Sequence, residues 1–136
     1  MSLKKFLHKL GQKMPIAAEE TLIVVYSICL DGLSAEDANT IRDAISLAGP
    51  VDFRFLSPGS FEAIFEGDTT SIGRANDLAH KLRKLATDHA ISSFGVSVEH
   101  GPCIVQRSPV GGFSFFPAGD TVSRAIKMAH AEASAG

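Results

Sequence analysis

Histidine and cysteine side chains are the first candidates for chemistry, because they can bind metal ions, transfer protons or attack as nucleophiles. The chain has five histidines and two cysteines. They do not occur in the HExxH or CxxC spacing that gathers ligands around zinc. We therefore interpret the histidines as surface or helix-capping residues. Cys29 and Cys103 lie in apolar runs, so we interpret them as small buried hydrophobic residues in a reducing compartment.

Motifs for phosphate binding and for hydrolysis are absent from the sequence. It contains no GxxxxGKS/T or GxGxxG loop and no GxSxG nucleophile elbow. Lys and Arg number 13 against 15 Asp and Glu, and this net charge of −2 does not indicate a nucleic-acid partner. The longest apolar stretch falls short of the roughly 20 residues that a membrane helix needs. We therefore expect a cytoplasmic protein without a membrane span.

Apolar periodicity predicts the elements that would position any site. The run Thr21–Leu30 is apolar on both faces, as expected for a central strand. Ser34 and Asp37 form a capping pattern for a helix over Ser34–Ala48, and a second apolar stripe predicts a helix over Ile72–Ala86. The other expected strands cover residues 51–55, 61–65, 92–99, 103–106 and 113–116, and a last helix begins near Thr121.

Two pairs of these strands are expected to form hairpins. Ser57–Ser60 contains a Pro-Gly turn between the first pair, and His100–Pro102 separates the second. The resulting order is β-α-β-β-α-β-β-β-α. It predicts an α/β (α+β) fold of the ferredoxin-like type, a two-layer sandwich in which the first two helices cover one face of a mixed, mostly antiparallel sheet.

Residues 1–20 are predicted to form a basic amphipathic segment ahead of the domain, which covers residues 21–136. Four lysines and four apolar residues alternate there at helical spacing: Lys4, Lys5, Lys9 and Lys13 with Phe6, Leu7, Leu10 and Met14. The segment could be a helix that packs on a partner subunit, a solvated terminus, or a contact with a membrane surface.

Four segments between residue 21 and about residue 130 resemble the catalytic domain of class III adenylate and guanylate cyclases. Val25–Ile28 falls where that family has Phe-x-Asp-Ile, and Pro58–Phe65 resembles its Gly-Asp-x-x-x-Ala-x-Phe turn and strand. Phe94–Val105 is similar to its GIxxHxG segment with the apolar strand that follows. Phe115–Met128 resembles an aromatic strand, a Gly-Asp-x-Val-Asn turn and a helix.

The resemblance implies a two-metal mechanism in which two carboxylates hold Mg²⁺ or Mn²⁺. The first metal position corresponds to Ser27 and the second to Gly59, and neither has a carboxylate. Asp31 could replace the first ligand if the strand alignment slips, because Asp31 and Ser27 would lie on the same face of the strand.

The family's other functional positions are changed as well. Its base-recognising lysine falls at or near Phe55, and its purine-selecting residue falls near Ser114. Its ribose-orienting asparagine corresponds to Ser123, and its transition-state arginine corresponds to Lys127. Lysine keeps the charge but loses the planar fork that grips phosphate.

These substitutions favour a degenerate, non-catalytic cyclase homology domain that acts in signal transduction. It would need no cofactor and would bind a nucleotide or other ligand, a second copy, or a cyclase-like or signalling partner. Family members pair head to tail, which implies a homodimer or heterodimer with Phe55 at or near the interface. The alternatives are an active cyclase with unusual contacts to Mg²⁺ or Mn²⁺, and an unrelated ferredoxin-like ligand-binding module.

Overall fold

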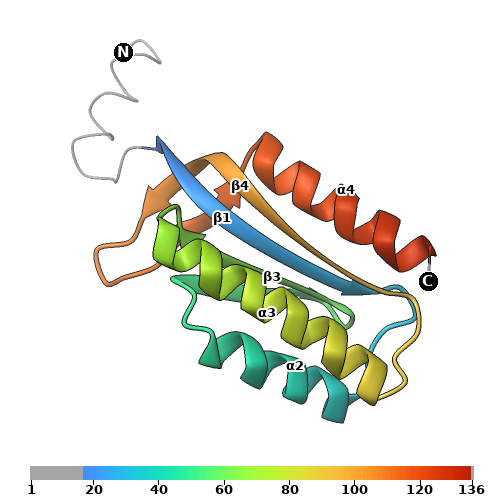
Figure 1. The fold of residues 1–136 in the computed structure, drawn as a ribbon. Coiled ribbons are helices and arrows are strands. Elements are labelled where there is room, and N and C mark those ends of the chain that lie inside the picture. Colours follow the sequence, from blue (N-terminus) through green and yellow to red (C-terminus); the bar gives the residue numbers. More distant parts are fainter. Residues whose placement is uncertain (1–16, 136) are drawn as a thin grey trace, which may run out of the picture.

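Five antiparallel strands form a single sheet in the order β2-β3-β1-β4-β5 (Figure 1). The structure is a computed structural model that describes residues 17–135, so residues 1–16 of the predicted basic segment lie outside the described residues. The strands are β1 (Ala18–Cys29), β2 (Asp52–Ser57), β3 (Ser60–Glu66), β4 (Phe94–Arg107) and β5 (Phe113–Ala118). The helices are α2 (Ala35–Leu47), α3 (Thr69–Asp88) and α4 (Asp120–Ala135).

Strand β1 is the centre of the sheet, as its apolar sequence predicts. It pairs with β3 on one side and β4 on the other. Its odd-numbered residues, such as Ile23 and Val25, pack in the same cluster as α2 and α3. Its even-numbered residues, such as Leu22 and Val24, pack in the cluster of α4. Helices cover both faces of β1, which explains why its residues are apolar on both faces.

Helices α2 and α3 lie side by side on one face of the sheet, as predicted (Figure 1). The Ser34 side chain accepts a hydrogen bond from the Asp37 backbone N–H and caps α2. Asp68 caps α3 in the same way, which places its start three residues before the predicted Ile72. The two-layer core of sheet and two helices is thus confirmed.

Helix α4 lies on the opposite face and packs closely on β1 and β4. Alanines at helical spacing face the sheet, and Ala125 and Ala129 are buried there. A Cβ atom at Gly95 of β4 would lie 2.0 Å from the carbonyl oxygen of Ala129. Small residues therefore set the close spacing between helix and sheet.

The predicted second hairpin is wrong, because β4 runs without a turn through His100–Pro102. Those residues continue the ladder with β1, where Pro102 pairs with Thr21. Gly101 contributes close packing rather than a turn, since a Cβ atom there would lie 2.7 Å from the Oγ1 of Thr121. A glycine in a strand can signal close approach as well as reversal.

The two edge strands of the sheet approach each other on the α4 face. The Phe113 backbone N–H of β5 donates to Oδ2 of Asp52 in β2, at 3.4 Å. The Arg54 guanidinium of β2 lies 4.3 Å from the ring centroid of Phe116 in β5. The sheet therefore curls until β5 meets β2. Within residues 17–135, the helices are too short or too polar to cross a membrane.

Candidate functional site

The end of β1 brings together the two positions that correspond to the family's metal ligands. Ser27 lies in β1 between Phe61 and Val96 of the neighbouring strands. Its residue is 1% exposed, and its Oγ atom has no hydrogen-bond partner in the described chain. A neutral, buried hydroxyl is a poor substitute for a carboxylate that must hold a hard divalent cation.

Gly59 lies in the turn between β2 and β3, against the end of β1. Its carbonyl oxygen accepts a hydrogen bond from the backbone N–H of Cys29, at 2.8 Å. A Cβ atom at this position would lie 2.4 Å from the carbonyl oxygen of Cys29 and 3.1 Å from the Cα of Gly32. The backbone therefore leaves no room for an aspartate, and the residues at these two positions do not fit a pair of metal ions.

Asp31 lies in the turn after β1 and lines a cavity of about 190 Å³. Asp37 and His89 line the same cavity and are joined by a hydrogen bond of 2.9 Å between Oδ1 and Nδ1. The Cys29 thiol donates to the carbonyl oxygen of Gly32 at 3.1 Å, so it is held in the cavity wall. Among the described residues, no group of three or more His, Cys, Asp or Glu could hold a metal ion.

Phe55 and Ser114, the two base-recognition positions, lie on opposite edge strands. The Phe55 ring centroid lies 4.3 Å from that of Phe61 and 5.4 Å from the guanidinium of Arg42. Phe55 is still 42% exposed. Ser114 is exposed on β5, and its hydroxyl donates to the carbonyl oxygen of Arg107 at 3.5 Å.

Ser123 and Lys127 are exposed on α4, one helical turn apart. The Ser123 hydroxyl donates to the carbonyl oxygen of Gly119 at 3.2 Å. Phe61 and Val96, the neighbours of Ser27, pack on the face of the sheet that α2 and α3 cover. Helix α4 lies on the opposite face. The sheet therefore separates these two residues from Ser27 within one chain.

Glu62 is a buried acid that is not among the predicted site residues. It is 1% exposed in the middle of β3, and its Oε1 atom has no hydrogen-bond partner in the described chain. Its other oxygen lies 3.7 Å from Nε of Arg54. Burial raises the pKa of Glu62 to about 7, although the Arg54 charge opposes that shift. The sequence does contain a signal for this burial. Glu62 and Ile64 are two residues apart in a strand, so they share a face, and Ile64 is buried.

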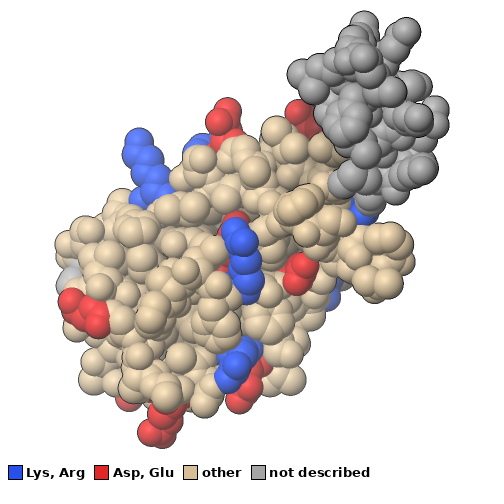
Figure 2. Space-filling view, turned by 180° about the vertical axis from the view of Figure 1, so that it is seen from behind, with Lys and Arg blue, Asp and Glu red and all other residues tan. Residues whose placement is uncertain are grey.

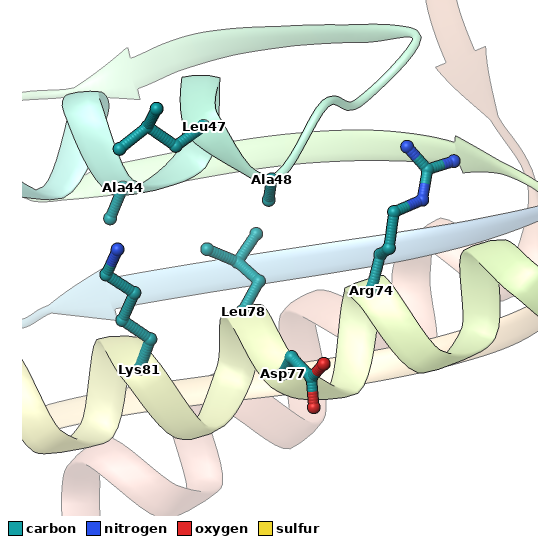
Figure 3. Close-up of a pocket in the computed structure, with 7 residues that line it drawn as sticks. All are labelled: Ala44, Leu47, Ala48, Arg74, Asp77, Leu78 and Lys81. Carbon is teal, nitrogen blue, oxygen red and sulfur yellow. The ribbon is translucent and has the colours of Figure 1, made fainter.

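A separate groove of about 240 Å³ lies between α2 and α3 (Figure 3). Leu47, Ala44 and Leu78 form its apolar lining, and the Lys81 side chain extends toward Ala44. At one end of the groove, the Arg74 guanidinium donates hydrogen bonds to the Gly49 carbonyl oxygen and the Ser71 hydroxyl oxygen. These bonds connect the end of α2 to α3. This groove contains none of the predicted site residues.

Solved nucleotide cyclases share this arrangement of strands and helices. The guanylyl cyclase Cya2 is 13% identical with a TM-score of 0.57, over 84% of this chain and 71% of that one. The chain has the fold of a class III nucleotide cyclase catalytic domain. The catalytic core of a rhodopsin-guanylyl cyclase with converted specificity, in complex with ATPαS, is 19% identical with a TM-score of 0.58, over 83% of this chain and 73% of that one.

A bacterial light-regulated adenylyl cyclase has the same cyclase fold. It is 14% identical with a TM-score of 0.55, over 93% of this chain. This chain covers 49% of that protein, so it spans about half its length. No family model and no curated protein matches the sequence.

Proposed function

We propose that this cyclase-fold domain makes no cyclic nucleotide and acts in signal transduction by binding a second copy, a cyclase-like or signalling partner, or a ligand such as a nucleotide. The observation that carries the proposal is the packing at Gly59, where a Cβ atom would lie 2.4 Å from a backbone carbonyl oxygen. With Ser27 at the other metal position, neither cation would have its carboxylate. Metal ions supply several kcal/mol of transition-state stabilisation in phosphoryl chemistry.

Exposed aromatic and aliphatic side chains support the binding role. Phe55 and the adjacent Leu56 are 42% and 39% exposed on edge strand β2. Seen from behind, most of the surface is formed by residues other than Lys, Arg, Asp and Glu, and the Lys and Arg side chains near its middle lie close to acidic ones (Figure 2). A surface with few charged side chains offers little to a highly charged partner. A cytoplasmic location belongs to the same proposal, because both cysteines are buried free thiols.

An active cyclase with unusual metal contacts is the competing function, and the position of Asp31 favours it. Asp31 and Asp37 are two carboxylates that line one cavity beyond the end of β1. A cation held between them would lie past the positions that correspond to Ser27 and Gly59. We place this function second because Asp37 already pairs with His89.

One titration distinguishes the two functions. The purified chain is mixed with ATP or GTP in the presence of Mg²⁺ or Mn²⁺, and both heat of binding and cyclic product are followed. We expect no cyclic product, whether or not nucleotide binds. Turnover that disappears in Asp31→Ala and persists in Asp43→Ala, an exposed control on α2, would establish the enzyme instead.

A further inference from the structure

Strand β5 is the edge strand next to β4, and on the α4 face of the sheet it is also joined to β2. We call residues 113–118 the strap. One attachment is the hydrogen bond from the Phe113 backbone N–H to Asp52. The other is Arg54, whose guanidinium lies 4.3 Å from the Phe116 ring centroid. Both attachments run from side chains of β2 to β5 on the α4 face of the curled sheet, so they hold the strap without pairing the backbone edge of β2.

Glycines flank the strap at both ends. Gly112 has φ of 67° and Gly119 has φ of 118°, conformations that residues with a Cβ atom rarely adopt. The pairing between β5 and β4 is also irregular, with register shifts between Ile104 and Arg107. A segment with permissive ends and an interrupted ladder can separate from the sheet without unfolding β1 or β4.

Arg54 links the strap to the buried acid Glu62. The two residues are directly opposite in the β2–β3 pairing, and Nε of Arg54 is 3.7 Å from Oε2 of Glu62. That distance is too long for a hydrogen bond, and Oε1 of Glu62 has no partner in the described chain. A protonated carboxyl tolerates this environment, but a carboxylate needs a closer cation or water.

Other ionisable groups near Glu62 do not replace Arg54 as its counter-ion. Strand β5 has no ionisable side chain, and burial raises the pKa of the Cys103 thiol on β4, which stays neutral. The remaining groups lie on β1, β2, β4 and α4, and each of them has a contact with another residue. They are Tyr26, Asp52, Glu99 with Arg124 at 3.7 Å, and His130, whose ring centroid is 6.3 Å from that of Tyr26.

We propose that β5 is a proton-controlled strap with Glu62 as its sensor. While Glu62 is protonated, Arg54 stays against Phe116 and the strap is closed. When Glu62 releases its proton to solvent, the carboxylate draws Arg54 away from Phe116 and admits water. The strap then swings away from β2 about Gly112 and Gly119. This device does not depend on whether the proposed binding function is correct.

The linkage between proton binding by Glu62 and opening of the strap fixes the direction of the pH effect and the pH range in which it occurs. Burial in the closed form raises the pKa of Glu62 to about 7, and in the open form it returns toward its ordinary value of 4.5. Opening is therefore favoured about tenfold per pH unit as pH rises from 4.5 to 7. Above pH 7 both forms are ionised, so the opening equilibrium becomes constant.

Amide hydrogen exchange on the full chain tests the strap. Protection factors, corrected for the intrinsic pH dependence of exchange, are measured between pH 4.5 and 8 for β1 and for the strap residues that have an amide hydrogen, 113–116 and 118. We expect protection in the strap to fall about tenfold per unit up to pH 7 and then to level off, while β1 keeps its protection. In Glu62→Gln the strap should lose this pH dependence. Glu66→Gln, on the same face of β3 but paired with Arg107, should keep it.

Three results would overturn the proposal. They are strap protection that is constant with pH, a pH dependence that persists in Glu62→Gln and so belongs to another group, and an equal loss of protection in β1. Should Glu62→Gln fail to fold, the wild-type chain gives the answer by NMR. The Glu62 carboxyl carbon and the Phe116 ring must then titrate with one midpoint, and different midpoints would also reject the strap.

Discussion

Gly59 shows how one residue decides both packing and chemistry. The glycine lets the β2–β3 turn lie against the end of β1, where its carbonyl oxygen pairs with the Cys29 N–H. The same contact excludes the side chain that a metal site needs. Loss of the carboxylate is therefore built into the backbone of this chain, and a single substitution would not restore it.

The packing at Gly59 predicts a loss of stability on adding one methyl group. We expect Gly59→Ala to lower the free energy of unfolding by about 2 to 3 kcal/mol, because backbone atoms of β1 must move. Gly73→Ala is the matched control, since no atom lies within 4 Å of its Cβ position in α3. That change should raise stability by about 0.5 to 1 kcal/mol. Urea unfolding of both variants decides the matter, and equal effects would contradict the packing argument.

Glu62 predicts how stability depends on pH. Its pKa is about 7 in the folded chain against 4.5 as its ordinary value, so the folded state binds the proton more tightly. Its contribution is fully present below pH 4.5, falls as pH rises, and is lost above pH 7. The shift corresponds to about 3 kcal/mol. Denaturant unfolding from pH 4.5 to 8 should show this decline in wild type and a flatter profile in Glu62→Gln. Parallel profiles would mean that another group titrates.

At the scale of elements, local signals predicted the helices well and the later strands less well. Capping residues and apolar stripes placed α2 and α3 within a few residues of their observed ends. The second hairpin was missed because Gly101 and Pro102 favour a turn locally, whereas here they continue β4 against β1 and α4. The hairpin prediction is wrong because tertiary packing determines the structure of this segment, and a local sequence pattern contains no information about that packing.

Helix α4 is held on β4 by Gly95, which gives a prediction about that layer. A Cβ atom at Gly95 would lie 2.0 Å from the Ala129 carbonyl oxygen and 2.6 Å from the Ala133 nitrogen. Gly95→Ala should therefore push α4 outward and cost about 1 to 3 kcal/mol. Ser134→Ala, on the exposed side of the same helix end, should change stability by less than about 0.5 kcal/mol. The stabilities of the two variants are compared by thermal unfolding. A Gly95→Ala variant as stable as wild type would show that α4 is loosely packed.

At the scale of the molecule, the sequence predicted the sheet with α2 and α3 and the cyclase resemblance, but not the meeting of β5 with β2. That meeting joins residues about sixty positions apart through Asp52, Arg54, Phe113 and Phe116. Curling of a sheet sums small twists over every strand, so no short segment encodes it. The burial of Glu62 likewise depends on the strands on both sides of β3, which the sequence of β3 alone does not specify.

Edge strand β2 leads to the last prediction, which concerns self-association. Within residues 17–135 its backbone pairs with β3 on one side and with no strand on the other, and Phe55 and Leu56 are exposed along it. An edge with apolar side chains is a ready surface for another chain. We expect the wild type to sediment as a homodimer at high concentration. Phe55→Lys should weaken that dimer at least about tenfold, which corresponds to 1.4 kcal/mol.

The control for this measurement is Leu47→Lys, which alters an apolar residue that is 79% exposed on α2, in the groove of Figure 3. Because Leu47 lies in the groove between α2 and α3 and not on strand β2, we expect the dimer of Leu47→Lys to be as strong as that of wild type. Phe55→Lys should still fold, since Phe61 beneath it is buried mainly by α2, α3 and the sheet. A wild type that stays monomeric at high concentration, with stability unaltered in Phe55→Lys, would remove Phe55 from any interface and leave a ligand as the partner to seek.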